Sequence, residues 1–326
     1  MRKYRTLMNR FKGYLIILLL LTACKNEGEK SSKNNESNFN LKVERFEQKF
    51  YEPELYELDD LKFNFPYLFP SQTPDSVWNS KRYNEEEIEL YKLTKKEFDT
   101  FEVQKKEIVQ LFKNIKKYNA AFKNPKLITL ITNLDFENKV IYADSLLLIS
   151  IDMYLGKRSP VYIDFPEYIS QNFDKSRLPV DIANAIINSQ FKSGKGRQFL
   201  HNILNEGKKM YLLDMYVPNL SDEIKMGYNS EKMQWVRENE VQIWKYFIEN
   251  ELLYSTNADL YTRFIANAPF SKFYLDIDKE SPGKVGVWLG WQIVKSYMKN
   301  NNVTLQQLLQ TNAEDIFNKS KYKPKK

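Results

Sequence analysis

The chain of 326 residues has only one cysteine, Cys24, and one histidine, His201. One cysteine excludes an intramolecular disulfide framework and a zinc site made from several cysteines. One histidine excludes the zinc-binding helix motif H-E-x-x-H and any other site that needs two imidazoles. The patterns G-x-x-x-x-G-K-[ST] and G-x-S-x-G, typical of phosphate-binding loops and α/β-hydrolases, do not occur. The motifs therefore predict no catalytic residue, no metal and no cofactor.

The sequence also lacks a hydrophobic run long enough to cross a bilayer. The strongly apolar run Leu15 to Leu21 is short, whereas a membrane-spanning helix needs about 20 residues. Five basic residues and no acidic residue precede this run, and small residues follow it. This order is typical of a secretory signal peptide. We expect residues 1–23 to be removed by cleavage between Ala23 and Cys24.

The residues Leu21-Thr22-Ala23-Cys24 resemble the lipobox of bacterial lipoproteins. The resemblance implies that the thiol of Cys24 is lipid-modified, and several acyl chains would hold the protein stably at a membrane. Residues 24–40 are mostly Lys, Asn, Glu and Ser, so we expect a flexible tether. Lys25 stands where aspartate would signal retention at the inner membrane, which favours the outer membrane. The alternative is an ordinary signal peptide with an incidental cysteine.

The formal net charge of +7 overstates the basic character of the mature chain. Five of the 49 basic residues lie in the expected signal peptide, which leaves 44 basic and 42 acidic residues. Five more lysines lie in the last eight residues, so we expect residues 317–326 to form a solvated basic tail. Little basic surface remains to bind phosphates, and we therefore expect no nucleic-acid partner.

Hydrophobic spacing predicts one α+β domain over residues 41–316. Residues 41–50 alternate weakly and are compatible with a first strand. Asn84 followed by three glutamates is typical of a helix start, and residues 95–118 have the spacing of an amphipathic helix. Short β-rich runs predict a small mixed sheet over 122–155. A mainly helical half follows, with helices expected over 166–173, 179–191, 197–216, 230–250, 258–265, 286–300 and 304–310.

Isolated candidates for chemistry have simpler structural interpretations. The stretch Ser193 to Gly196 is too short for a phosphate-binding loop and is typical of a helix end and turn. His201 lies within a predicted helix without identifiable catalytic partners, which favours a structural role. Asp152 and Asp164 lie beside the predicted sheet and leave a paired-carboxylate glycosidase open as an alternative.

The order and spacing of several segments resemble the gliding-motility lipoprotein family GldB of gliding Bacteroidetes. The resemblance covers essentially the whole chain and implies a membrane-anchored component of the gliding machinery, with other envelope proteins as partners. The segments that carry it, besides the lipobox, are Ile151-Asp152-Met153-Tyr154-Leu155-Gly156, Phe165-Pro166-Glu167-Tyr168-Ile169, Asn205-Glu206-Gly207-Lys208, Pro282-Gly283-Lys284-Val285-Gly286 and Gly290-Trp291.

The C-terminal half is also similar to a predicted zincin-type peptidase family. Members have H-E-x-x-H on a helix and a further acidic ligand downstream. That resemblance places Asn184 and Asn188 at the two histidine positions, Ala185 at the general base and Glu206 at the third ligand. Asparagine amides bind zinc weakly and alanine accepts no proton. The resemblance thus implies a zincin-like fold without its metal site; otherwise Asn184 and Asn188 are ordinary polar positions on an amphipathic helix.

A cleft that has lost its ligands could hold a segment of a partner protein near Asn184, Glu206 and Trp291. Trp288 and Trp291 are aromatics of the kind that anchor interfaces, but core packing in a buried helix is the favoured explanation for both. The leading hypothesis is therefore a non-catalytic gliding lipoprotein. A cell-envelope hydrolase acting on peptide or glycan and an envelope ligand-binding lipoprotein are the alternatives.

Two short segments fit an O-glycosylation pattern of Bacteroidetes envelopes. They are Asp75-Ser76-Val77 and Asp144-Ser145-Leu146. So short a pattern occurs often by chance. Exposure of Ser76 or Ser145 is the property that modification would require.

Overall fold

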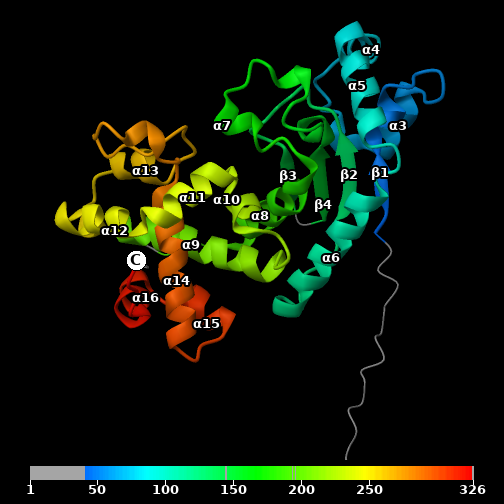
Figure 1. The fold of residues 1–326 in the computed structure, drawn as a ribbon. Helices are drawn as coiled ribbons and strands as arrows, with labels where there is room; N and C mark the ends of the chain where they lie inside the picture. Colours follow the sequence, from blue (N-terminus) through cyan, green and yellow to red (C-terminus); the bar gives the residue numbers. More distant parts are fainter. Residues whose placement is uncertain (1–40, 144, 193, 195, 325–326) are drawn as a thin grey trace, which may run out of the picture. The chain divides into compact units, whose positions relative to one another are not determined.

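The computed structural model describes residues 41–143, 145–192, 194 and 196–324, and residues 41–326 form one compact unit (Figure 1). The expected signal peptide, the cleavage at Ala23–Cys24, the lipid on Cys24 and the tether all fall on residues 1–40, outside the described residues.

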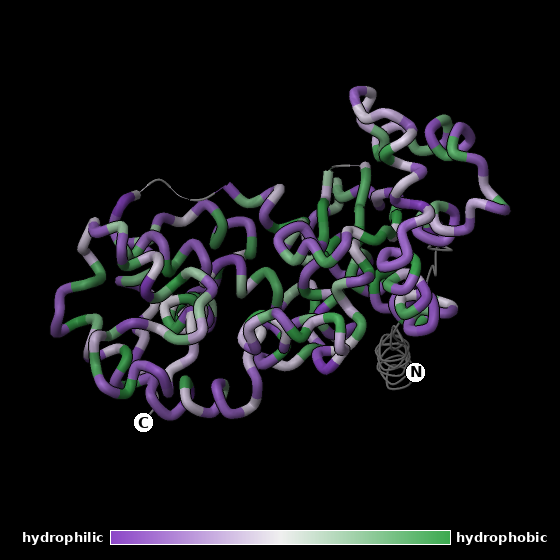
Figure 2. The backbone as a smooth tube through the Cα atoms, turned by 90° about the horizontal axis from the view of Figure 1, so that it is seen from above, coloured by the Kyte–Doolittle hydropathy of each residue, from purple (hydrophilic) through white to green (hydrophobic). Residues whose placement is uncertain are grey.

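A four-stranded mixed sheet confirms the predicted α+β class. Its strands are β1 (Val43–Arg45), β2 (Lys126–Leu130), β3 (Val140–Ala143) and β4 (Leu146–Ser150), in the order β1-β2-β4-β3. The strands β1, β2 and β4 are parallel, while β3 runs antiparallel to β4 at one edge. The inner strands β2 and β4 are rich in Leu and Ile because their residues are covered by helices, and they appear as hydrophobic stretches in Figure 2.

The first predicted strand is shorter than expected. Only residues 43–45 are extended, and Phe46–Phe50 forms helix α2. Phe46 and Phe50 are both buried, and a separation of four residues places them on the same side of a helix. They enter an aromatic cluster with Phe65, Phe69 and Tyr91.

Helices of the N-terminal part surround this cluster. They are α3 (Leu58–Asn64), α4 (Asp75–Arg82), α5 (Glu85–Glu97) and α6 (Glu102–Tyr118). The predicted cap is confirmed, since Asn84 accepts from the backbone N–H of Glu87 at 2.9 Å. The helix predicted over 95–118 is instead two helices, because Phe101 adopts a left-handed conformation (φ 55°) and is buried together with Phe98.

The helical half begins after Gly156. Its α-helices are α7 (Glu167–Ser170), α8 (Leu178–Gln190), α9 (Phe199–Tyr216), α10 (Asp222–Met226), α11 (Ser230–Glu238), α12 (Glu240–Glu249), α13 (Asp259–Phe264), α14 (Val285–Asn300), α15 (Leu305–Gln310) and α16 (Ala313–Ser320). Short 3₁₀ segments connect them and the earlier elements: η1 (Pro66–Leu68), η2 (Ile151–Tyr154), η3 (Pro160–Tyr162), η4 (Lys175–Arg177), η5 (Leu252–Tyr254) and η6 (Asp278–Glu280).

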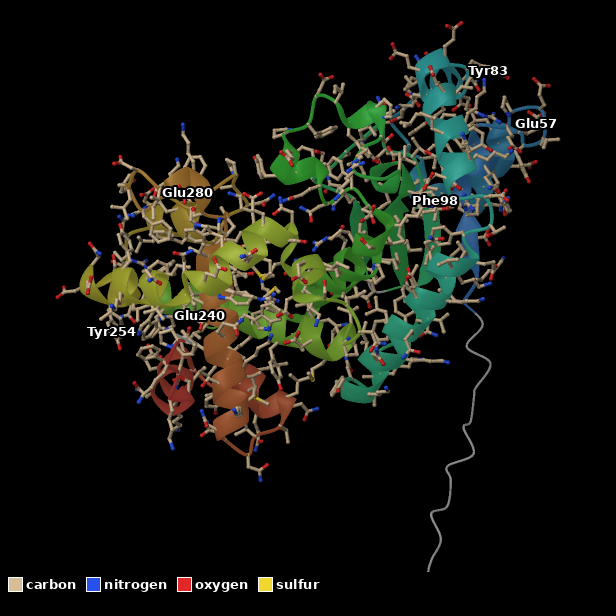
Figure 3. All side chains as sticks on the ribbon, in the orientation of Figure 1. Glu57, Tyr83, Phe98, Glu240, Tyr254 and Glu280 are labelled. Carbon is tan, nitrogen blue, oxygen red and sulfur yellow. The ribbon has the colours of Figure 1, made fainter. Side chains whose placement is uncertain are left out.

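The basic tail begins later than the boundary expected at residue 317. Helix α16 continues through Ser320, whose carbonyl accepts from Ser296 at 2.8 Å. Tyr322 then packs its ring against Trp244 and donates to Glu240 at 2.8 Å. Aromatic packing therefore holds part of this lysine-rich segment against the helical half (Figure 3).

The helices α9 and α14 cross in near-backbone contact at the centre of the helical half (Figure 1). A Cβ on Gly290 would overlap the carbonyl oxygen of Ile203, and a Cβ on Gly207 would overlap the carbonyl oxygen of Gly290. Glycine at these two positions is what permits the close crossing.

Candidate functional site

An open pocket of about 560 Å³ lies where four loop segments meet. Its lining comes from residues 166–171 with α7, 227–232 at the start of α11, 267–269 after α13, and 282–284 before α14. We call it the loop pocket. Figure 1 shows α7 above α10 and α13 to the upper left of α11.

Close backbone packing shapes the walls of the loop pocket. A Cβ on Gly283 would overlap the carbonyl oxygen of Ala268, so the third and fourth segments touch through glycine. The hydroxyl of Tyr228 donates to the carbonyl oxygen of Gly283. Gln171 donates to the carbonyl oxygen of Gly227 at 3.1 Å. These bonds join the four segments into one defined cavity.

Lys284 extends from the wall of the loop pocket toward the interior. It precedes α14 in a left-handed conformation (φ 62°), and its Nζ donates to the carbonyl oxygen of Met226 at 2.7 Å. Burial lowers the pKa of Lys284 to about 8. The neighbouring cations Arg177 and Lys139 lower this pKa further, while Asp181 and Glu206 oppose the shift. Lys284 has no ion pair within the described part of the chain.

A buried ion cluster lies beneath the loop pocket on α8. Asp181 pairs with Lys139 at 2.6 Å and with Arg177 at 3.0 Å, and it accepts from the hydroxyl of Tyr154 at 3.0 Å. Burial alone would raise the pKa of Asp181, but the two cations outweigh it and lower the pKa. Arg177 also donates to the carbonyl oxygen of Lys225 at 3.3 Å, which ties α8 to α10.

The rim of the loop pocket carries both signs of charge. Glu167 and Glu231 are exposed. The ammonium group of Lys232 is already bonded to the backbone, since its Nζ donates to the carbonyl oxygens of Glu280 at 2.7 Å and Ser281 at 3.3 Å. Of the two lysines in this lining, Lys284 therefore makes fewer hydrogen bonds than Lys232.

The residues of the predicted cleft do not line the loop pocket. Asn184 and Ala185 are partly buried, and Asn188 is exposed, all on the same side of α8 as Asp181. Glu206 is partly buried on α9 and pairs with Lys209 at 2.8 Å. The charge of Glu206 nevertheless raises the pKa of Lys284, so a residue of the expected cleft interacts electrostatically with a residue of the loop pocket.

Trp288 and Trp291 are core residues, which corrects their proposed place in a cleft. Trp291 is completely buried, and its indole N–H donates to Asp214 at 2.8 Å. Trp288 donates to Glu240 at 3.1 Å. Each indole satisfies its polar atom inside the helical half, which is how buried tryptophan is normally accommodated.

The isolated candidates lie in different environments. His201 pairs with Glu314 at 3.0 Å. Asp152 is completely buried, whereas Asp164 is exposed.

The other sequence candidates lie on the surface or near undescribed residues. Ser76 is exposed in the first turn of α4, and Ser145 is exposed in the turn before β4. Ser193 and Lys195 lie outside the described residues. Gly194 donates its N–H to Asn205 at 3.2 Å, which links this loop to α9.

Lys284 and the loop pocket were not identified from the sequence. The segment Pro282-Gly283-Lys284-Val285-Gly286 contributes only to the family resemblance. A lysine between two glycines before a helix is the signal that could have drawn attention to it. The four loops are spread over residues 166–284 of the chain, and nothing in local spacing predicts that they meet.

Among the described residues, no group of three His, Cys, Asp or Glu side chains is arranged to hold a metal ion. No helix within the described ranges has both the length and the apolar character to span a membrane.

Comparison with known proteins gives one family. A family model described as gliding motility protein GldB matches residues 27–324. No curated protein and no solved structure matches the chain significantly.

Proposed function

Because the chain belongs to the GldB family of gliding motility proteins, we propose that it is a lipid-anchored, non-catalytic component of the gliding machinery. The family match over residues 27–324 is the observation that carries this proposal. It covers the whole of the described fold, including all four segments of the loop pocket.

Anchoring is proposed from the sequence before residue 41. A basic segment, a short apolar run and Leu21-Thr22-Ala23-Cys24 follow one another in the order of a lipoprotein signal. The name of the matching family model also designates a lipoprotein. Lys25, directly after the cysteine, supports the outer membrane as the destination.

The non-catalytic role is proposed from the residues at the zincin-like positions. Asn184, Ala185 and Asn188 would replace both metal-binding imidazoles and the general base. Metal analysis of the purified protein separates this proposal from a zinc hydrolase. One tightly bound zinc per chain would favour the hydrolase and contradict the non-catalytic role.

The loop pocket is the proposed contact point for a partner protein. It is concave, it is lined by backbone, tyrosine and charged groups, and its walls are fixed by internal hydrogen bonds. Preformed pockets of this size are the usual places for recognition.

The test of anchoring and motility is the variant Cys24→Ser expressed at the native level. Without the thiol, no lipid can be attached, so we expect the protein to leave the membrane fraction and colonies to stop spreading. The control replaces residues 1–24 with the signal peptide and acylated cysteine of another outer-membrane lipoprotein, which should restore spreading. Normal spreading by unanchored protein would contradict the proposal.

A further inference from the structure

We propose that the loop pocket binds an extended segment of a partner protein through one acidic side chain of that segment, which pairs with Lys284. This inference rests on the proposed function as a partner-binding protein and specifies the chemistry of the partner.

The charges around Lys284 favour an anion. Its ammonium group is close enough to Arg177 and Lys139 to feel their charges. The two nearby acids are already paired: Asp181 with Lys139 and Arg177, and Glu206 with Lys209. Behind the rim, Lys284, Arg177 and Lys139 thus face two carboxylates that already have cationic partners, and one more carboxylate would improve the balance.

The hydrogen bonding of Lys284 leads to the same conclusion. An ammonium group has three donors, and the one bond found for Lys284 among the described residues goes to the carbonyl oxygen of Met226. A buried charge without a counter-charge is costly. By contrast, Lys232 in the same lining donates to three carbonyl oxygens.

The depth of the ammonium group favours a side chain over a chain terminus. Met226, its acceptor, is 1% exposed and lies behind the pocket wall. A carboxylate at the end of a Glu or Asp side chain extends beyond the partner backbone and can reach this depth. A C-terminal carboxylate would reach the ammonium group only where the partner chain ends inside the pocket.

The lining favours a polypeptide segment as the ligand. Pro166, Pro269 and Pro282 together with Tyr168 and Tyr228 give rigid apolar and aromatic surfaces. Aromatic-lined grooves receive extended peptides. The volume of about 560 Å³ suits a few residues and not a whole domain.

The rim limits the charge of that segment. Glu167 and Glu231 are exposed at the edge of the loop pocket. They would repel a run of acidic residues and favour basic or neutral neighbours. The expected ligand therefore has one central acid with basic or neutral flanks.

The experiment uses a library of random ten-residue peptides displayed on phage and the full mature chain in detergent micelles. We expect enriched sequences to share one acid at a fixed position. The best peptide is then synthesised with Glu or Asp at that position, with the matching Gln or Asn, and with its own C-terminus free or amidated. Fluorescence anisotropy measures the Kd of each.

We expect the acid-to-amide change to weaken binding about tenfold or more, as for a charge-assisted hydrogen bond. Lys284→Met should weaken binding of the acidic peptide until its Kd equals that of the amide peptide. Lys284→Arg should retain part of the preference for the acidic peptide over the amide peptide. The matched control is Lys299→Met, an exposed lysine near the other end of α14 that should leave both Kd values unchanged. Circular dichroism confirms that each variant is folded.

Three outcomes would overturn the inference. They are no enrichment at all, equal binding of acid and amide peptides, and dependence on the free C-terminus in place of the acidic side chain. Peptides that bind without an acidic preference would leave the proposed function standing. Normal spreading of Cys24→Ser cells would instead contradict the proposed function without bearing on peptide selectivity.

Discussion

Asp152 shows how one buried carboxylate organises the loop that follows the central strand. Its side chain accepts from the backbone N–H groups of Leu134 at 2.8 Å and Thr132 at 3.2 Å. Leu134 and Asn133 both adopt left-handed conformations, with φ of 65° and 59°. The carboxylate thus holds a strained turn in place, and the described residues provide no cationic partner for it.

This environment predicts a specific pH dependence of stability. Burial raises the pKa of Asp152 from 3.8 to about 6, although the backbone donors oppose the shift. The folded chain then binds more protons than the unfolded chain between these values, so the contribution of Asp152 to the free energy of unfolding decreases as pH rises from about 4 to 6. A shift of this size corresponds to about 3 kcal/mol.

The variant Asp152→Asn removes the titration and keeps one acceptor for Leu134. Denaturant unfolding of both proteins at pH 4, 5, 6 and 7 gives their difference in free energy. We expect the free energy of unfolding of the variant to increase relative to that of the parent as pH rises, by about 2–3 kcal/mol over this range. A difference independent of pH would show that Asp152 titrates normally.

At the scale of single elements, the crossing of α9 and α14 depends on two glycines. Gly290→Ala would press a methyl group into the carbonyl oxygen of Ile203 on α9. Both partners are helix backbone and cannot rotate away, so the helices must separate. We expect the free energy of unfolding to decrease by about 3 kcal/mol, at the upper end for overpacking, as measured by urea denaturation.

Gly194→Ala is the matched control for this change. A Cβ there would lie 3.5 Å from Oδ1 of Asn205, an ordinary contact. We expect its stability to stay within about 0.5 kcal/mol of the parent, as for other surface substitutions. Equal effects of the two variants would mean that the close crossing is not what makes Gly290 necessary.

The sequence predicted most elements because their hydrophobic periodicity is local. The strands of the sheet, the long helices and the cap at Asn84 were all found in this way. Periodicity could not locate the breaks at Phe101 and Asn239, because the apolar spacing continues through both. A left-handed residue or a tight junction is fixed by tertiary packing, and local spacing does not report it.

The site was predicted less well than the elements. The resemblance to zincin-type peptidases points to Asn184, Asn188 and Glu206, and none of these residues lines the loop pocket. Lys284 became visible only once the chain was folded, because its significance depends on neighbours far away in the sequence. Charge balance at a site is a property of the fold and has no local pattern.

At the scale of the whole described fold, the cluster around Asp181 joins the sheet to the helical half. Lys139 lies just before β3, and Asp181 lies in the first turn of α8. Arg177 ends η4, just before α8, and reaches Lys225 on α10. Because the segment 227–232 follows α10 directly, this cluster also positions one wall of the loop pocket. Stability and recognition should therefore respond together when it is broken.

The variant Asp181→Asn tests this coupling. It leaves two buried cations without their carboxylate, so we expect the free energy of unfolding to decrease by about 3–5 kcal/mol at pH 7. Since the pKa of Asp181 is lowered in the fold, its contribution is present above about pH 4 and is lost as pH falls through the lowered value. The difference between variant and parent should accordingly shrink in acid.

Hydrogen exchange locates the effect of the same variant within the fold. We expect faster exchange of the backbone amides in α10 and in residues 227–232. Without Asp181 to fix it, the guanidinium of Arg177 would hold the carbonyl oxygen of Lys225 less firmly. Asp315→Asn is the control, since its pair with Lys319 is exposed and its loss should change nothing measurable. If exchange increased only around β3 and left α10 unchanged, the cluster would hold the sheet edge alone, and the wall of the loop pocket would owe its position to the bonds of Tyr228 and Gln171.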